Sequence, residues 1–174
     1  SGIIPGGISY LDFAIVAQTD KVSAKTILLT LVANKIGTNH EGQIHFKKGD
    51  KIKAVIFAIG KGAPIEEVSK RLDWKDFEGL VAEILASKNF AIVKNLILTK
   101  PRMEIDVVGI RLGIAMLIDC KHWKRHSTSS LSNVVQKQID RTKQYVSKTQ
   151  NSLAVPVIVT LYQDKINFID NVPI

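Results

Sequence analysis

The stretch from Met103 to Trp123, MEIDVVGIRLGIAMLIDCKHW, constrains the fold most, because it places charged side chains inside two apolar runs that look like β-strands. Alternate residues of a strand share a face, so Asp119 and Lys121 point the same way on the second strand. Asp106 lies on the first strand. Burying such charges costs free energy unless they are paired or bound to a metal. The hairpin therefore predicts either a functional site or a structural Asp-Lys ion pair.

The chain is long enough for one domain, or for one domain with a small appendage, at 174 residues. Its formal net charge of +8 and its sequence pI of about 9.6 favour polyanionic partners. Most of this excess follows the acidic pair, since residues 120–148 hold seven Lys or Arg residues against Asp140 alone. The charge distribution favours a polyanionic partner without saying which one.

Cys120 is the single cysteine, which excludes an internal disulfide and is typical of a reducing cytosol. The apolar runs are far shorter than the roughly 20 residues that span a bilayer. The first ten residues, SGIIPGGISY, lack the basic flank and the long apolar run of a signal peptide. We therefore expect a cytoplasmic protein that has no membrane partner.

Residues 1–72 predict a helical N-terminal segment. Residues 10–17 and 22–35 have helical patterns, and residues 38–49 indicate a loop or a short hairpin. Between residues 50 and 72, two helical patterns flank a glycine turn, which outlines a possible helix-turn-helix. Glutamates on its outer face would repel phosphate, so the outline fits either a DNA-reading unit or a helical packing or dimerisation module.

Residues 73–174 predict an α/β order of helix, three strands, helix and two strands. Asp73 is placed to cap the first of these helices. At about 100° per residue, Glu78 borders the apolar stripe of that helix and Glu83 lies almost opposite it. Glu78 can therefore face a site beside the core, whereas Glu83 is expected in water.

Asp106, Asp119 and Lys121 together have the residue types for phosphodiester hydrolysis. Two carboxylates close together repel each other unless a cation lies between them, and a hard divalent ion such as Mg²⁺ prefers oxygen ligands. A metal held in this way polarises a phosphoryl oxygen and activates water, while a lysine stabilises developing charge.

The sequence also resembles a known family. The motif Ile105-Asp106, followed by IDCKHW at residues 118–123, is similar to the motifs of PD-(D/E)XK nucleases, especially Mrr-type restriction endonucleases and archaeal Holliday-junction resolvases. The segment DFEGLVAEILASKNFAIV resembles the opening helix and first strand of these enzymes. The resemblance covers about residues 73–170 and leaves residues 1–72 unexplained. It implies a restriction-endonuclease-like α/β domain with a central mixed sheet flanked by helices.

In that family pattern, Glu78, Asp106 and Asp119 would hold Mg²⁺, or Mn²⁺ as a substitute. Lys121 would assist the nucleophilic water, and the backbone carbonyl of Cys120 would complete the metal shell. The sequence departs from the pattern at two positions. Ile105 stands where the motif has proline, and Asp119 stands where glutamate is more frequent.

The resemblance implies a metal-dependent endonuclease that hydrolyses DNA, duplex or branched, in repair, recombination or restriction. A homodimer is expected, since cutting both strands generally needs two active sites. A catalytically silent nucleic-acid-binding or scaffold protein and an RNA-processing nuclease remain alternatives. The basic residues expected to contact nucleic acid are Arg102, Lys124, Arg125, Lys137 and Arg141.

Overall fold

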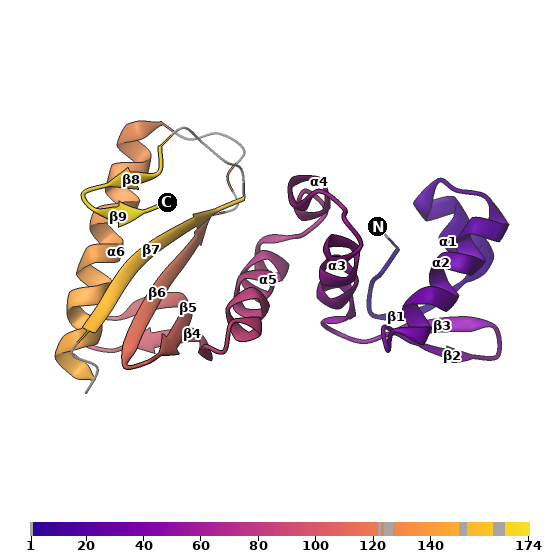
Figure 1. Cartoon of the computed structure of the whole chain (residues 1–174), viewed down its shortest axis with the longest axis horizontal. Helices are drawn as coiled ribbons and strands as arrows, with labels where there is room; N and C mark the ends of the chain where they lie inside the picture. Colours follow the sequence, from indigo (N-terminus) through magenta and orange to yellow (C-terminus); the bar gives the residue numbers. More distant parts are fainter. Residues whose placement is uncertain (1, 122, 124–126, 150–152, 162–165) are drawn as a thin grey trace. The chain divides into compact units, whose positions relative to one another are not determined.

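The computed structural model describes residues 2–121, 123, 127–149, 153–161 and 166–174. The chain divides into two compact units, Ser1–Arg71 and Leu72–Ile174, called here the N-terminal unit and the C-terminal unit. In Figure 1 the first is coloured indigo to magenta and the second magenta to yellow.

The N-terminal unit combines helices with a small antiparallel sheet in the strand order β1-β3-β2. Its elements are β1 (Gly6–Ser9), α1 (Tyr10–Ala17), α2 (Lys21–Ala33), β2 (Thr38–His40), β3 (Gln43–Phe46), α3 (Asp50–Gly60) and α4 (Ile65–Ser69). A short turn joins α1 to α2, and the β2-β3 hairpin follows directly. The unit therefore contains two consecutive helices joined by a short turn and followed by a hairpin.

Local signals explain the start of α2. The Asp20 side chain accepts hydrogen bonds from the backbone N–H groups of Val22 and Ser23, both at 2.9 Å, which satisfies two of the free donors at the helix start. Apolar residues of α2 and β3, with Phe13 of α1, then form one core. Its fully buried members are Ala24, Leu28 and Ile44.

The sequence predicted residues 10–17 as a helix, and α1 has these bounds. The predicted loop or short hairpin at residues 38–49 is the β2-β3 hairpin, whereas β1 was not predicted. In the proposed helix-turn-helix of residues 50–72, the second helix, α4, is only five residues long. The helix pair that precedes the hairpin is α1-α2.

The C-terminal unit is an α/β structure with a mixed sheet in the order β4-β5-β6-β7. Its elements are α5 (Trp74–Ser87), β4 (Ala91–Leu98), β5 (Met103–Arg111), β6 (Ile114–Lys121), α6 (Thr128–Lys148), β7 (Leu153–Thr160), β8 (Phe168–Ile169) and β9 (Val172–Pro173). The pairs β4-β5 and β5-β6 are antiparallel, and β6-β7 is parallel. Helix α6 makes the crossover that a parallel pair requires.

The two long helices of this unit cover opposite faces of the sheet. Val107 and Ile118 are register partners on β5 and β6, and they pack with Phe77 of α5. The next pair, Val108 and Leu117, points to the other face by strand alternation. That face is covered by α6, whose Tyr145 lies in the same cluster. The acidic residues of the hairpin thus lie on central strands between two helical layers.

Helix α6 is fixed at both ends. Ser127 and Ser130 form a capping box at its start. Near its end, Gln144 Nε2 donates to the carbonyl of Pro101 at 2.8 Å, which ties the helix to the β4-β5 turn. Within the part of the chain that the structure describes, no helix is both long and apolar enough to cross a membrane.

Candidate functional site

The β5-β6 pairing places Asp106 and Asp119 beside each other. Val107 and Ile118 are paired, and each acid lies one position beyond this pair on its own strand. Asp119 is also the register partner of Ile158 on β7. The sheet therefore brings two acidic residues that are thirteen positions apart in the sequence onto neighbouring strands.

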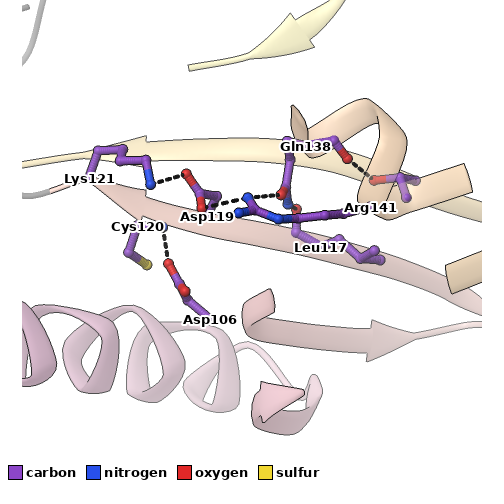
Figure 2. A network of polar contacts seen from close by, with 8 residues as sticks. Asp106, Leu117, Asp119, Cys120, Lys121, Gln138 and Arg141 are labelled. Atoms are coloured by element: carbon purple, nitrogen blue, oxygen red, sulfur yellow. Dashed lines mark hydrogen bonds and ion pairs between the residues drawn. The ribbon is translucent and has the colours of Figure 1, made fainter. Parts of the chain in front are cut away.

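Asp119 is the centre of a buried ion-pair network, shown in Figure 2. The residue is only 3% exposed. Its Oδ2 atom lies 2.7 Å from the Lys121 ammonium nitrogen, and its Oδ1 atom accepts a hydrogen bond from Arg141 Nη1 at 2.9 Å. The two cations approach the carboxylate from opposite sides. Both carboxylate oxygens of this buried aspartate therefore have a cationic partner.

Gln138 supports this network and was not identified as a site residue from the sequence. Its side chain is fully buried on α6, where Nε2 donates to the Leu117 carbonyl at 2.7 Å. Its Oε1 atom accepts from Arg141 Nη1 at 3.1 Å, so Gln138 orients the guanidinium that holds Asp119. Its position on the buried stripe, between Val135 and Thr142, is the sequence signal that could have found it.

Asp106 lies on β5, the strand next to the one that carries Asp119. Its Oδ2 atom accepts a hydrogen bond from the backbone N–H of Cys120 at 2.7 Å. Burial and the negative charge of Asp119 raise the pKa of Asp106, although the Cys120 hydrogen bond and the charges of Lys121 and Arg141 act in the opposite direction. Asp106 is therefore less well compensated than Asp119.

Glu78, on α5, completes the acidic group. The residue is 9% exposed, whereas Glu83 on the same helix is exposed, as helical spacing predicts. Burial, followed by the charges of Asp106 and Glu104, raises the pKa of Glu78 to about 7, against an opposing effect of Lys75. The region between α5 and the hairpin therefore carries negative potential that protein cations do not fully neutralise.

The negative charges of the acidic residues also act on the Cys120 thiol. Burial, and then the charges of Asp106 and Glu78, raise the pKa of this thiol well above its usual range. The side chain packs with the α5-facing core, while the backbone N–H serves Asp106. Cys120 is thus a protonated packing residue whose backbone, rather than its sulfur, contributes to the site.

The acids have the chemistry of a site for a hard cation, but their side chains do not converge on one point. Among the described residues, no three His, Cys, Asp or Glu side chains are gathered closely enough to hold a metal ion. Glu78 and Asp106 have raised pKa values that a cation would lower. Asp119 would have to exchange one of its present partners, Lys121 or Arg141, for the metal.

The residues expected to contact nucleic acid occupy different environments. Arg102 and Lys137 are exposed. Arg141 is engaged with Asp119 and Gln138, and its side chain is only 22% exposed. Lys124 and Arg125 lie outside the described residues. The structure thus leaves Arg102 and Lys137 accessible to a polyanion and places Arg141 inside the acidic site.

Comparison with known proteins finds relatives whose functions are not characterised. No protein-family model matches the chain. The chain is similar to crystal structures of a protein of unknown function, AF1548 (21% identity, TM-score 0.39), and of protein VC1899 from Vibrio cholerae (16% identity, TM-score 0.41). The alignments cover 51% and 91% of this chain, but only 47% and 38% of those proteins, so the chain spans half of their length or less.

A sequence relative gives the family. An uncharacterized protein from Archaeoglobus fulgidus is 31% identical over 99 residues, an alignment that covers 55% of this chain and 76% of the relative. The chain belongs to the same family as this uncharacterized archaeal protein.

Proposed function

We propose that the C-terminal unit is a restriction-endonuclease-like, metal-dependent nuclease that hydrolyses phosphodiester bonds of DNA. The observation that carries the proposal is the incompletely compensated negative charge at Glu78 and Asp106, where burial and neighbouring carboxylates raise both pKa values. Crowded, buried carboxylates destabilise a fold unless a cation joins them. Their place beside Asp119 and Lys121 matches the residue order of the nuclease motif that the sequence resembles.

In this proposal, the side chains of Glu78, Asp106 and Asp119, which are not gathered closely enough in this structure, would turn toward one another and hold a divalent cation through carboxylate oxygens. Bound there, Mg²⁺ or Mn²⁺ would polarise a phosphoryl oxygen and lower the pKa of a coordinated water. Oxygen ligands of this type suit both ions.

The other residues have positioning roles. Lys121 is 24% exposed, so its ammonium group reaches from the Asp119 carboxylate to the solvent side of the site. On leaving Asp119, it would donate hydrogen bonds to the attacking water or to the phosphate oxygens that gain charge. Arg141, held by Gln138, keeps the Asp119 carboxylate oriented throughout.

One observation favours a second candidate, a catalytically silent nucleic-acid-binding or scaffold protein. Both Asp119 oxygens already have cationic partners, as expected of a structural ion network that joins β6 to α6. In that case Lys121 would never leave Asp119, and metal ions would have no effect.

Cleavage assays separate the two candidates. The full chain is incubated with plasmid, branched and single-stranded DNA, and with RNA, in Mg²⁺, Mn²⁺ or EDTA. We expect metal-dependent cleavage of DNA that falls by at least about 100-fold in Lys121→Ala, the typical cost of removing a group that stabilises transition-state charge. Lys143→Ala removes the same charge from an exposed position on α6 and should cleave like the wild type.

Equal cleavage by wild type and Lys121→Ala would remove the catalytic assignment. Nucleic-acid binding without cleavage of any substrate would favour the silent protein. Cleavage confined to RNA would keep the site chemistry and change the substrate.

A further inference from the structure

The N-terminal unit contains a basic pocket that the nuclease proposal does not use. It has a volume of about 110 Å³ and lies between the α2-β2 turn, the β2-β3 hairpin and the start of α3. The side chains that line it include Lys35, Thr38, His45, Lys47, Asp50 and Lys53. A water molecule needs about 10–15 Å³ of such volume, so the pocket can hold a polyatomic ion.

The charges around the pocket are mostly positive. Three lysines face one aspartate, which leaves a net charge of +2 without counting the histidine. The aspartate, Asp50, is 4% exposed and engaged: it accepts a hydrogen bond from the backbone N–H of Lys47 at 2.8 Å, and Lys53 Nζ lies 3.2 Å from its other oxygen. Burial opposes its charged form, but these hydrogen bonds outweigh burial and lower the pKa of Asp50.

Two of the lysines have no such compensation. In residues 2–121 and the other described parts of the chain, no carboxylate forms an ion pair with the ammonium group of Lys35 or Lys47. Both residues are exposed at the pocket, so their ammonium groups can turn toward a bound anion. Asp50 neutralises Lys53 alone, and the pocket keeps an excess of hydrogen-bond donors.

The backbone around these lysines is fixed. Gly37 has φ +80°, and a Cβ atom there would lie 2.9 Å from the Phe46 ring, so the α2-β2 turn requires glycine. On the other side, the Asp50 carboxylate closes the β3-α3 turn through the Lys47 N–H. The positions of Lys35 and Lys47 relative to each other are therefore set by the fold before any ligand arrives.

Two further hydrogen-bond donors complete the pocket. Thr38 and His45 are register partners on β2 and β3, so their side chains lie next to each other on one face of the hairpin. The threonine hydroxyl and a ring N–H of the histidine can each donate to an oxygen atom. Lysine ammonium groups and hydroxyl donors around a small cavity are the chemistry that binds a tetrahedral oxyanion.

We propose that this pocket binds a phosphate group, held by Lys35 and Lys47 with Thr38 and His45 as further hydrogen-bond donors. The phosphate can come from a small phosphorylated molecule or from a nucleic-acid backbone. The site uses no residue of the C-terminal unit, so a test of phosphate binding does not depend on the nuclease proposal.

The first test follows the amide resonances of Gly37 and Thr38 in the full, metal-free chain while inorganic phosphate is added against chloride at matched ionic strength. Wild type should show saturable shifts, and Lys35→Ala/Lys47→Ala should show none. Lys21→Ala/Lys25→Ala is the matched control, because it removes two exposed charges from the same unit outside the pocket. Unchanged core resonances in each variant establish that it is folded.

The second test measures binding of a fluorescent DNA duplex in EDTA over a range of salt concentrations. If the phosphate belongs to a nucleic acid, the pocket variant should bind at least about tenfold more weakly. Its salt dependence should also be smaller, by about 0.9 in log-log slope for each DNA phosphate that the variant no longer neutralises. If the pocket variant loses the response to inorganic phosphate but binds DNA like the control, the pocket binds small phosphorylated molecules. If the pocket variant matches the control with both probes, the proposal is wrong.

Discussion

Replacing Glu78 by glutamine tests the electrostatics of the acidic site most simply. The change removes a buried negative charge and keeps the shape of the side chain. In the wild type, the pKa of Glu78 is raised from its usual 4.5 to about 7 by burial and by the neighbouring acids. The folded protein therefore binds more protons than the unfolded chain between about pH 4.5 and pH 7, and its stability falls as the pH rises through this window.

The size of the effect follows from the pKa values. One pKa unit corresponds to about 1.4 kcal/mol, so the wild type should lose up to about 3 kcal/mol relative to Glu78→Gln between pH 4.5 and pH 7. The stability of Glu78→Gln minus that of the wild type should therefore be about 3 kcal/mol larger above pH 7 than below pH 4.5.

Urea unfolding followed by tryptophan fluorescence measures this difference. Both tryptophans, Trp74 and Trp123, belong to the C-terminal unit, so the signal reports that unit alone. Glu83→Gln is the control, because it makes the same change at an exposed position of the same helix and should follow the wild type. Parallel pH profiles for wild type and Glu78→Gln would refute the reasoning.

Three further outcomes are expected. Gln138→Met leaves the Leu117 carbonyl and one Arg141 N–H without their partner and should cost about 1–3 kcal/mol of stability in the same urea assay; an unchanged midpoint would contradict the network. The Cys120 thiol, with its raised pKa, should resist iodoacetamide at pH 8 in the folded protein and react after unfolding, as mass spectrometry would show. Calorimetry should find that Mn²⁺ affinity increases with pH up to about 7, as Glu78 loses its proton, and a flat profile would exclude Glu78 as a ligand.

The order of helices and strands from α5 to β7 could be predicted because its patterns are local, whereas in the described part of the chain three strands, β7, β8 and β9, follow α6 where two were predicted. The strand at residues 153–160 is a continuous apolar run, and the helix at residues 74–87 has a capping aspartate and an apolar stripe. Strand β1 could not be predicted, because Gly6–Ser9 has no alternating pattern and becomes a strand only by pairing with β3. Its structure is set by a partner more than thirty residues away.

The sequence predicted which faces Glu78, Asp119 and Lys121 occupy, but it did not predict how the charged side chains pair. Helical spacing distinguished Glu78 from Glu83, and strand alternation brought Asp119 and Lys121 to one face. Sequence reasoning assigned Arg141 to nucleic acid, since nothing local links it to an aspartate 22 positions earlier. The ion pair exists because the crossover helix α6 packs on the sheet.

The basic pocket of the N-terminal unit was also beyond sequence reasoning. The histidines and lysines near residue 45 were visible in the sequence, but Lys35 lies in the α2-β2 turn and Lys53 lies on α3. Only the folded hairpin and the start of α3 bring them together around one cavity.

Metal titration tests the central claim most directly. Isothermal titration of Mn²⁺ into the full chain, above the pKa of Glu78, should show one site that is abolished in Asp106→Asn and kept in Glu83→Gln. Absence of binding to the wild type, or equal binding by Asp106→Asn, would contradict a metal site at these carboxylates and leave the Asp119 network as a structural feature.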